Sequence, residues 1–227
     1  MPPTPRHSLP APPPRHALAS GLALLLTSLL VALWLRTTPR PVFQDLDDNW
    51  AASVNASSAG GGGDTWAIVL DRLGGPFGLV LPLALVGCLC VYGRWRSALF
   101  VFAAAVGANV LVVLPLKALA GRPRPPHPGV LVNDGSYPSG QVFSAVVLVI
   151  AVAVVVFPPR ARRWWWPAGV AYVLAMMASR TWLHAQWLTD TFAGVLLGVG
   201  TALLLWRAFE PLLRTEAERM ASDSLWL

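Results

Sequence analysis

Three short polar clusters interrupt the long apolar runs of the second half of the chain. They read K-A-L-A-G-R-P-R-P at 117–125, Y-P-S-G-Q at 137–141 and S-R-T-W-L-H-A-Q-W-L-T-D at 179–190. Charged side chains are scarce in this sequence, yet four cations lie in the clusters at the edges of apolar segments: Lys117, Arg122, Arg124 and Arg180. Ionisable groups at membrane depth are energetically costly, so their presence there indicates a function.

The clusters contain the donors that a phosphate group requires. Lys117 offers a compact positive charge, whereas Arg124 and Arg180 offer planar guanidinium groups that match phosphate oxygens. A helix that begins near Ser139 would direct free backbone N–H groups toward an anion, and the Ser139 hydroxyl can cap its first turn. Gly140 would let the backbone approach a ligand closely. We predict that these residues form a phosphate cradle, although a single arginine at a helix end also commonly extends to lipid headgroups.

The elements that position the clusters are six apolar segments. Of the 227 residues, 55% are hydrophobic and only 12% are charged, whereas about a quarter of the residues of a soluble domain are charged. A bilayer crossing needs roughly 17–25 apolar residues. The segments that approach this length are 17–35, 77–92, 98–119, 142–157, 165–178 and 187–206. The predicted fold class is all-α, a polytopic membrane protein with six transmembrane helices in a bundle.

Basic residues set the predicted orientation. The chain carries 17 Lys and Arg against 11 Asp and Glu, but the cations are dispersed between apolar runs, which argues against a nucleic-acid partner. Ten of the 17 fall on one side of the predicted bundle: Arg6, Arg15, Arg94, Arg96, Arg160, Arg162, Arg163, Arg207, Arg214 and Arg219. The positive-inside rule assigns that side to the cytoplasm. We therefore expect an integral plasma (inner) membrane protein with both termini cytoplasmic and the three clusters on the extracytoplasmic face.

The remaining segments divide the chain into a membrane domain and two tails. Residues 1–16 are rich in Pro and Arg and are predicted to form a disordered cytoplasmic tail. The six-helix membrane domain covers 17–209, and 210–227 form a cytoplasmic tail of mixed charge. Within the domain we expect a polar external loop at 37–64 and a short interfacial helix at 65–73, where apolar and charged residues alternate with a helical period.

The order and spacing of the clusters carry a family resemblance. K-x6-R-P, P-S-G-x and S-R-x5-x-x3-D follow one another over about 75 residues. They resemble the signature of the type 2 phosphatidic acid phosphatase (PAP2) superfamily, and the predicted spans are similar to its membrane lipid phosphate phosphatase branch. The resemblance implies a membrane phosphatase for phosphatidate or a polyprenyl diphosphate such as undecaprenyl diphosphate, with neither a metal nor another cofactor. It assigns the phosphate-binding positions to Lys117, Arg124, Ser139, Gly140 and Arg180.

The resemblance also implies a mechanism from which this sequence departs. In the family, a histidine of the third motif attacks phosphorus and forms a phosphohistidine, and an aspartate four residues later, here Asp190, orients it. A histidine of the second motif protonates the departing alkoxide. This chain has Gln141 at the second-motif position and Gln186 at the third. A glutamine amide forms hydrogen bonds but does not titrate near neutral pH. Losing the general acid costs about 10²–10⁴ in rate, and losing the nucleophile costs on the order of 10⁶.

Several functions are compatible with this departure. One is an active hydrolase in which His184, two residues before Gln186, or His127 replaces the missing histidines. Another is a catalytically inactive pseudophosphatase that binds or senses anionic lipid headgroups. A transporter or flippase is disfavoured because the polar residues cluster on one face. The pattern also matches a phosphatase inactivated by two deliberate His-to-Gln changes.

Overall fold

The computed structural model describes residues 12–58, 64–75, 77–133 and 135–223, and this part of the chain is helical without a strand. The helices are α1 (Ala17–Thr37), α2 (Gln44–Ser58), α3 (Asp64–Gly74), α4 (Val80–Val91), α5 (Trp95–Phe102), the π-helical η1 (Ala103–Gly107) and η2 (Asn109–Val113), α6 (Leu114–Ala120), α7 (Gly140–Val155), α8 (Arg162–Trp182) and α9 (Leu188–Asp223). The predicted all-α class is confirmed.

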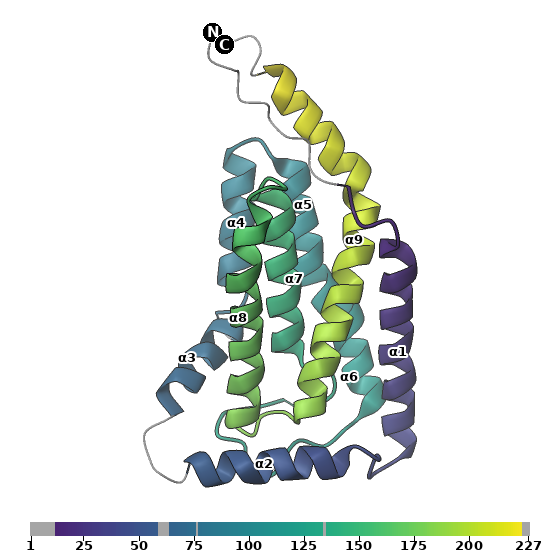
Figure 1. The fold of residues 1–227 in the computed structure, drawn as a ribbon, viewed down its shortest axis with the longest axis vertical. Helices are drawn as coiled ribbons and strands as arrows, with labels where there is room; N and C mark the ends of the chain where they lie inside the picture. The colour runs from purple at the N-terminus through teal and green to yellow at the C-terminus, as the bar shows by residue number, and fades with distance from the viewer. Residues whose placement is uncertain (1–11, 59–63, 76, 134, 224–227) are drawn as a thin grey trace.

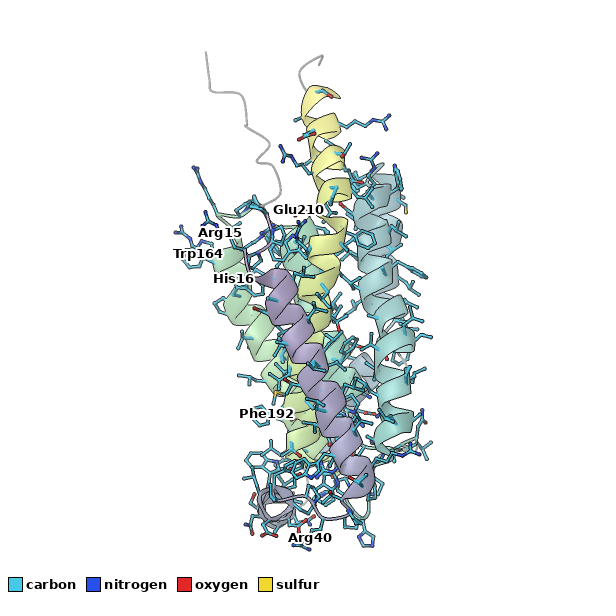
Figure 2. All side chains as sticks on the ribbon, turned by 90° about the vertical axis from the view of Figure 1, so that its right-hand side faces the viewer. Arg15, His16, Arg40, Trp164, Phe192 and Glu210 are labelled. Carbon is cyan, nitrogen blue, oxygen red and sulfur yellow. The ribbon has the colours of Figure 1, made fainter. Side chains whose placement is uncertain are left out.

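The long helices run side by side and connect alternately at two opposite ends of the bundle (Figure 1). One end, called the site end here, contains the loop at 121–139 and the turn at 183–187, and α2 lies across it. The other end, called the basic end, contains the turns at 92–94 and 156–161. Figure 2 shows Arg40 at the site end and Arg15 and Trp164 at the basic end.

Within the described ranges, three helical segments are long and apolar enough to cross a membrane. They are Ala17–Thr37, Trp95–Ala120 and Leu188–Ser222. The apolar helices Val80–Val91 and Gly140–Val155 are shorter; at 1.5 Å per residue they span about 18 and 24 Å, less than the hydrocarbon thickness of about 30 Å. The structure thus supports a membrane protein, whereas the six crossings expected from the sequence remain a prediction.

Close contact between α7 and α9 positions the second polar cluster. A Cβ atom on Gly194 of α9 would lie 2.7 Å from the carbonyl oxygen of Ser139, so a larger residue there would push the two helices apart. Next to this contact, Phe143 of α7 and Leu197 of α9 are fully buried in the same apolar cluster. This packing brings the N-terminus of α7 against the first turns of α9.

Two segments differ from their predicted form, and one agrees with it. The expected polar loop at 37–64 contains a 15-residue helix, α2, and Asp47 on this helix is buried in a tertiary ion pair with Arg122. The expected tail at 210–227 continues α9 as far as Asp223, so the helix does not stop at the predicted domain boundary. The helix predicted at 65–73 is confirmed as α3. Of the predicted N-terminal tail, residues 1–11 lie outside the described part.

Candidate phosphate-binding site

Lys117 lies in the last turn of α6 and is held by the loop that follows. The helix ends because Gly121 adopts a left-handed conformation (φ +57°) before a proline-rich segment. The Nζ atom of Lys117 donates to the carbonyl oxygens of Gly135 at 3.1 Å and Pro138 at 3.2 Å. Gly135 has φ +76°, and a Cβ there would lie 2.9 Å from Cγ of Lys117. The loop thus wraps tightly around the lysine and fixes the position of its ammonium group.

The N-terminus of α7 is capped as the sequence predicted. Ser139 is the N-cap residue, and its hydroxyl accepts a hydrogen bond from the amide of Val142 at 3.4 Å. Its own amide donates to the carbonyl oxygen of Asp190 at 3.0 Å, which ties the second cluster to the third. A Cβ on Gly140 would meet only Cγ1 of Val113, at 3.5 Å. Space is therefore open beside the first turn of α7, where backbone N–H groups favour an anion.

The two predicted arginines have different surroundings. Arg180, in the last turn of α8, is buried and forms an ion pair through Nη1 with Asp71 of α3. Its Nε atom is buried without a hydrogen-bond partner. Arg124 donates from Nε to the carbonyl oxygen of Asn133 at 2.6 Å and from Nη1 to that of Ala185. Arg124 therefore joins the loop at 121–139 to the turn at 183–187, whereas Arg180 retains an unsatisfied donor.

One cavity of about 900 Å³ is lined by four of the five predicted binding residues, Lys117, Arg124, Gly140 and Arg180, whereas Ser139 is buried outside the lining. Its polar lining comes from all three clusters, from α3 and from neighbouring helices and loops: Asp71, Arg72, Asn109, Lys117, Arg124, Asn133, Gln141, Ser144, Tyr172, Arg180 and Gln186. Apolar residues of α4, η1, η2 and α7 form the rest of the wall, among them Pro82, Ala105, Val110 and Leu148. Cationic groups at one part and apolar walls elsewhere match a ligand with an anionic head and a hydrocarbon chain.

The two glutamines of the motifs line this cavity with their amide orientations fixed. Gln141 donates from Nε2 to Oδ1 of Asp71 at 3.1 Å, and Gln186 donates from Nε2 to the carbonyl oxygen of Ser136 at 3.2 Å. Each donation goes to an oxygen atom, so the amide nitrogen must face that side. The Oε1 atoms of both glutamines are buried without a partner. The site therefore offers two acceptors in addition to its cations.

The candidate replacement histidines are not among the residues that line the cavity. His184 is buried in the turn that ends α8, at φ +48°, and its amide donates to the carbonyl oxygen of Thr181. Burial lowers the pKa of the His184 imidazole below its ordinary value, so the ring is neutral at pH 7. His127 is exposed, at φ +56°, and His16 lies at the opposite end of the bundle (Figure 2). The proposed relocation of the catalytic histidine gains no support from this geometry.

Asp190 takes part in a buried ion network instead of lining the cavity. Its Oδ1 accepts from Arg122 Nη1 at 2.6 Å, and its Oδ2 accepts from the hydroxyl of Ser136 and from the amide of Trp187. Arg122 also donates to Asp47 of α2 at 2.7 Å. No hydrogen bond between Asp190 and Gln186 occurs among the contacts that the structure describes. Both carboxylate oxygens of Asp190 thus connect α9 to the loop at 121–139 and to the turn at 183–187.

Sequence reasoning missed three contributions. Asp71 belongs to a segment that was interpreted only as an amphipathic helix, and Asp47 belongs to the segment that was predicted as a loop. Arg122 was noted as a cation at an apolar edge, but its ion-pair role was not predicted. Asp71 lies on the polar side of its helix with Asp64 and Arg72, and Asp47 has acidic neighbours, so nothing local distinguishes either carboxylate.

Comparisons with known proteins agree with this architecture. The family model of the PAP2 superfamily matches residues 98–214, a range that includes all three polar clusters. The chain belongs to the PAP2 superfamily. Its structure is similar to one described as the crystal structure of the first transmembrane PAP2 type phosphatidylglycerolphosphate phosphatase from Bacillus subtilis. The TM-score is 0.69 at 21% sequence identity, and the match covers 85% of this chain and 96% of the other.

The sequence identity to this structure is low, so the structural likeness shows a shared fold alone. No curated protein sequence matches this chain. The resemblance inferred from the spacing of the motifs is therefore confirmed at the level of the superfamily.

Proposed function

We propose that this PAP2 superfamily protein binds the phosphorylated headgroup of a membrane lipid, phosphatidate or a polyprenyl diphosphate, without turning it over through a phosphohistidine. The observation that carries this proposal is the lining of the cavity. Lys117, Arg124 and Arg180 lie on one cavity, and no histidine lines it within the part of the chain that the structure describes. The described lining thus supplies groups that bind phosphate and no histidine for a phosphohistidine mechanism.

Binding follows from the arrangement of charge around the cavity. The phosphoryl oxygens would accept from the ammonium of Lys117 and the guanidinium groups of Arg124 and Arg180, while the N-terminus of α7 at Gly140 adds its dipole. The hydrocarbon chain would lie along the apolar wall formed by α4, η1 and η2. We place this site on the extracytoplasmic face of the plasma (inner) membrane, because the basic residues gather at the opposite end.

Hydrolysis is the second candidate function, and membership of the superfamily favours it. It would require a nucleophile other than the third-motif residue, because an amide such as that of Gln186 cannot form a phosphohistidine. The two candidates predict opposite outcomes in one assay.

The test measures binding and phosphate release with purified protein in lipid nanodiscs. Short-chain phosphatidate and a polyprenyl diphosphate should bind saturably and release no phosphate. Arg180→Gln should weaken binding on the order of tenfold to a hundredfold, since it removes a charged donor. Arg160→Gln, at an exposed position of the basic end, is the matched control and should leave binding unchanged. Phosphate release by the unmodified protein, or no binding of either lipid, would overturn the proposal.

Restoring the two histidines gives a complementary measurement. The double variant Gln141→His and Gln186→His should gain phosphate release while it keeps its affinity for lipid phosphate. A double variant that binds but remains inactive would show that the departure extends beyond these two positions. The position of Asp190, which is already fully hydrogen-bonded to Arg122, Ser136 and Trp187, is the structural reason to expect a low rate.

A further inference from the structure

Among the residues that the structure describes, Asp71 of α3 is the only carboxylate that lines the cavity. Its Oδ1 atom accepts from Nη1 of Arg180 and from Nε2 of Gln141. The side chains of this ion pair are 14% exposed for Asp71 and 5% for Arg180. An oxygen of the protein itself therefore takes the acceptor position on Arg180 that a phosphoryl oxygen would take.

The carboxylate fills only part of the hydrogen-bonding capacity of the site. Nε of Arg180, Oε1 of Gln141 and Oε1 of Gln186 are buried without a partner. Arg180 and Gln186 are each only 4% exposed. Buried polar groups normally have partners, so the one donor and two acceptors indicate a site shaped for a ligand that supplies both an oxygen and O–H groups. A phosphate with its several oxygens and a bound water or hydroxyl would satisfy them.

Helix α3 holds Asp71 in place from both ends. Toward its N-terminus, the hydroxyl of Ser179 on α8 donates to the carbonyl oxygen of Ala67 at 2.8 Å. The indole of Trp182 donates to Asp64 at 2.9 Å. At the other end, a Cβ on Gly74 would lie 2.9 Å from Oε1 of Gln141. The helix thus packs directly on α8 and on the amide of the second motif.

This anchoring gives the carboxylate an advantage over ligands from the bilayer. A group tethered beside its partner acts at an effective concentration of millimolar or higher. An anion that accepts from Nη1 of Arg180 must first displace the Asp71 carboxylate, because both would occupy the same donor. The cost of opening the ion pair is the same for every anionic ligand, so it lowers all their affinities by a similar factor.

From these contacts we infer that Asp71 is an internal competitor for the phosphoryl position, and that it keeps the site free of phosphodiester headgroups. The inference rests on the proposed phosphate-binding function and concerns the regulation of that site. Diesters, the bulk lipids of a bilayer, carry one negative charge, as Asp71 does, and gain little by the exchange. A phosphate monoester or a diphosphate carries more charge and also engages Lys117 and Arg124. The cost of opening the Asp71–Arg180 ion pair therefore leaves monoesters and diphosphates bound, whereas it prevents diesters from binding.

The experiment compares two probes, dioctanoyl phosphatidate as the monoester and dioctanoyl phosphatidylglycerol as the diester, by calorimetry in detergent. Asp71→Asn should tighten monoester binding on the order of tenfold to a hundredfold, the equivalent of one charge-assisted hydrogen bond. It should also make diester binding measurable where the unmodified protein shows none. Asp45→Asn is the matched control, because Asp45 is an exposed carboxylate paired with Arg40 outside the cavity lining, and it should leave both affinities unchanged.

The outcomes separate this inference from the proposed function. If the unmodified protein and all variants fail to bind phosphatidate, the binding function itself is wrong. If the unmodified protein binds phosphatidate but Asp71→Asn binds it equally or more weakly, Asp71 is a positioning group for Arg180 and the inference is overturned. Asp71→Ser removes the same charge with a smaller side chain and repeats the comparison. If neither variant binds phosphatidate more tightly than the unmodified protein, the inference is likewise overturned.

Discussion

Arg122 and Arg180 lie at the same end of the bundle, each only 4% exposed, yet their surroundings differ. Arg122 donates to the carboxylates of Asp47 and Asp190 and is also hydrogen-bonded to Gln44 and Thr189. Arg180 has one carboxylate, Asp71, and a buried Nε without a partner. The first arginine is enclosed by its own protein, whereas the second faces a cavity.

The difference separates charges that hold the fold from charges that bind a ligand. A buried ion pair is stable only when its remaining donors and acceptors are satisfied. Arg122 meets that condition, and it joins α2, the loop at 121–139 and α9. Arg180 does not meet it until a ligand supplies oxygens. Both residues were noted from the sequence as costly cations, and only their partners distinguish them.

The largest expected effect comes from breaking the Arg122 network. Arg122→Met would leave Asp47 and Asp190 buried without a counter-charge, which typically costs 3–5 kcal/mol, so we expect a loss of about that size in the free energy of unfolding. Chemical denaturation in detergent would measure it. Arg40→Met is the matched control, since Arg40 pairs with Asp45 and Asp48 on the exposed surface, and it should cause no measurable loss. Equal stability of the two variants would contradict the structural role of Arg122.

An intermediate effect is expected where the loop encloses Lys117. Gly135→Ala combines a positive φ with a Cβ 2.9 Å from Cγ of Lys117, and such backbone strain costs about 1–3 kcal/mol. Because the ammonium group would shift, phosphatidate affinity should fall together with stability. Gly129→Ala on the same loop meets its neighbours at an ordinary 3.6 Å and should change neither. Unchanged affinity in Gly135→Ala would show that the position of Lys117 does not limit binding.

The smallest effect concerns His184 and its dependence on pH. Its pKa is lowered by burial, so the unfolded chain takes up a proton first as the pH falls through about 6.5, and the folded state loses stability there. His184→Gly removes this loss and also relieves the left-handed backbone at φ +48°. The variant's melting temperature should therefore fall less between pH 7.5 and pH 5.5. His127→Gly, exposed and at φ +56°, controls for the backbone effect alone. If the melting temperature of His184→Gly falls more steeply with pH than that of the unmodified protein, the lowered pKa of His184 is contradicted.

The sequence predicted the convergence of the three clusters because alternating helices and dispersed basic residues constrain topology strongly. Lys117 does contact the second cluster through Pro138, and Ser139 contacts the third through Asp190. The Ser139 cap followed from local chemistry alone. These features depend on residues close in sequence or on which end of a helix they occupy, and such information is present in one chain.

The partners of the arginines could not be predicted in the same way. Asp47 is adjacent to Asp48 and close to Asp45, yet among these three it alone is buried, on Arg122, which lies 75 residues later. Asp71 is similarly 109 residues from Arg180. Such pairs depend on how α2 and α3 dock on the bundle, and no periodicity in either helix encodes that docking. The sequence thus located the cations but not the carboxylates that decide their roles.

Helix α9 also fixes the spacing between the two polar ends. Glu216 accepts from the amides of Arg96 and Ser97 at the start of α5, about 42 Å along the helix from Leu188 at the site end. That distance exceeds the roughly 30 Å of a hydrocarbon core. A thinner or thicker bilayer must therefore be met by tilting of the whole bundle or by local deformation of the lipid. This single carboxylate ties the far part of α9 to α5, so the length of one helix keeps the two polar ends apart.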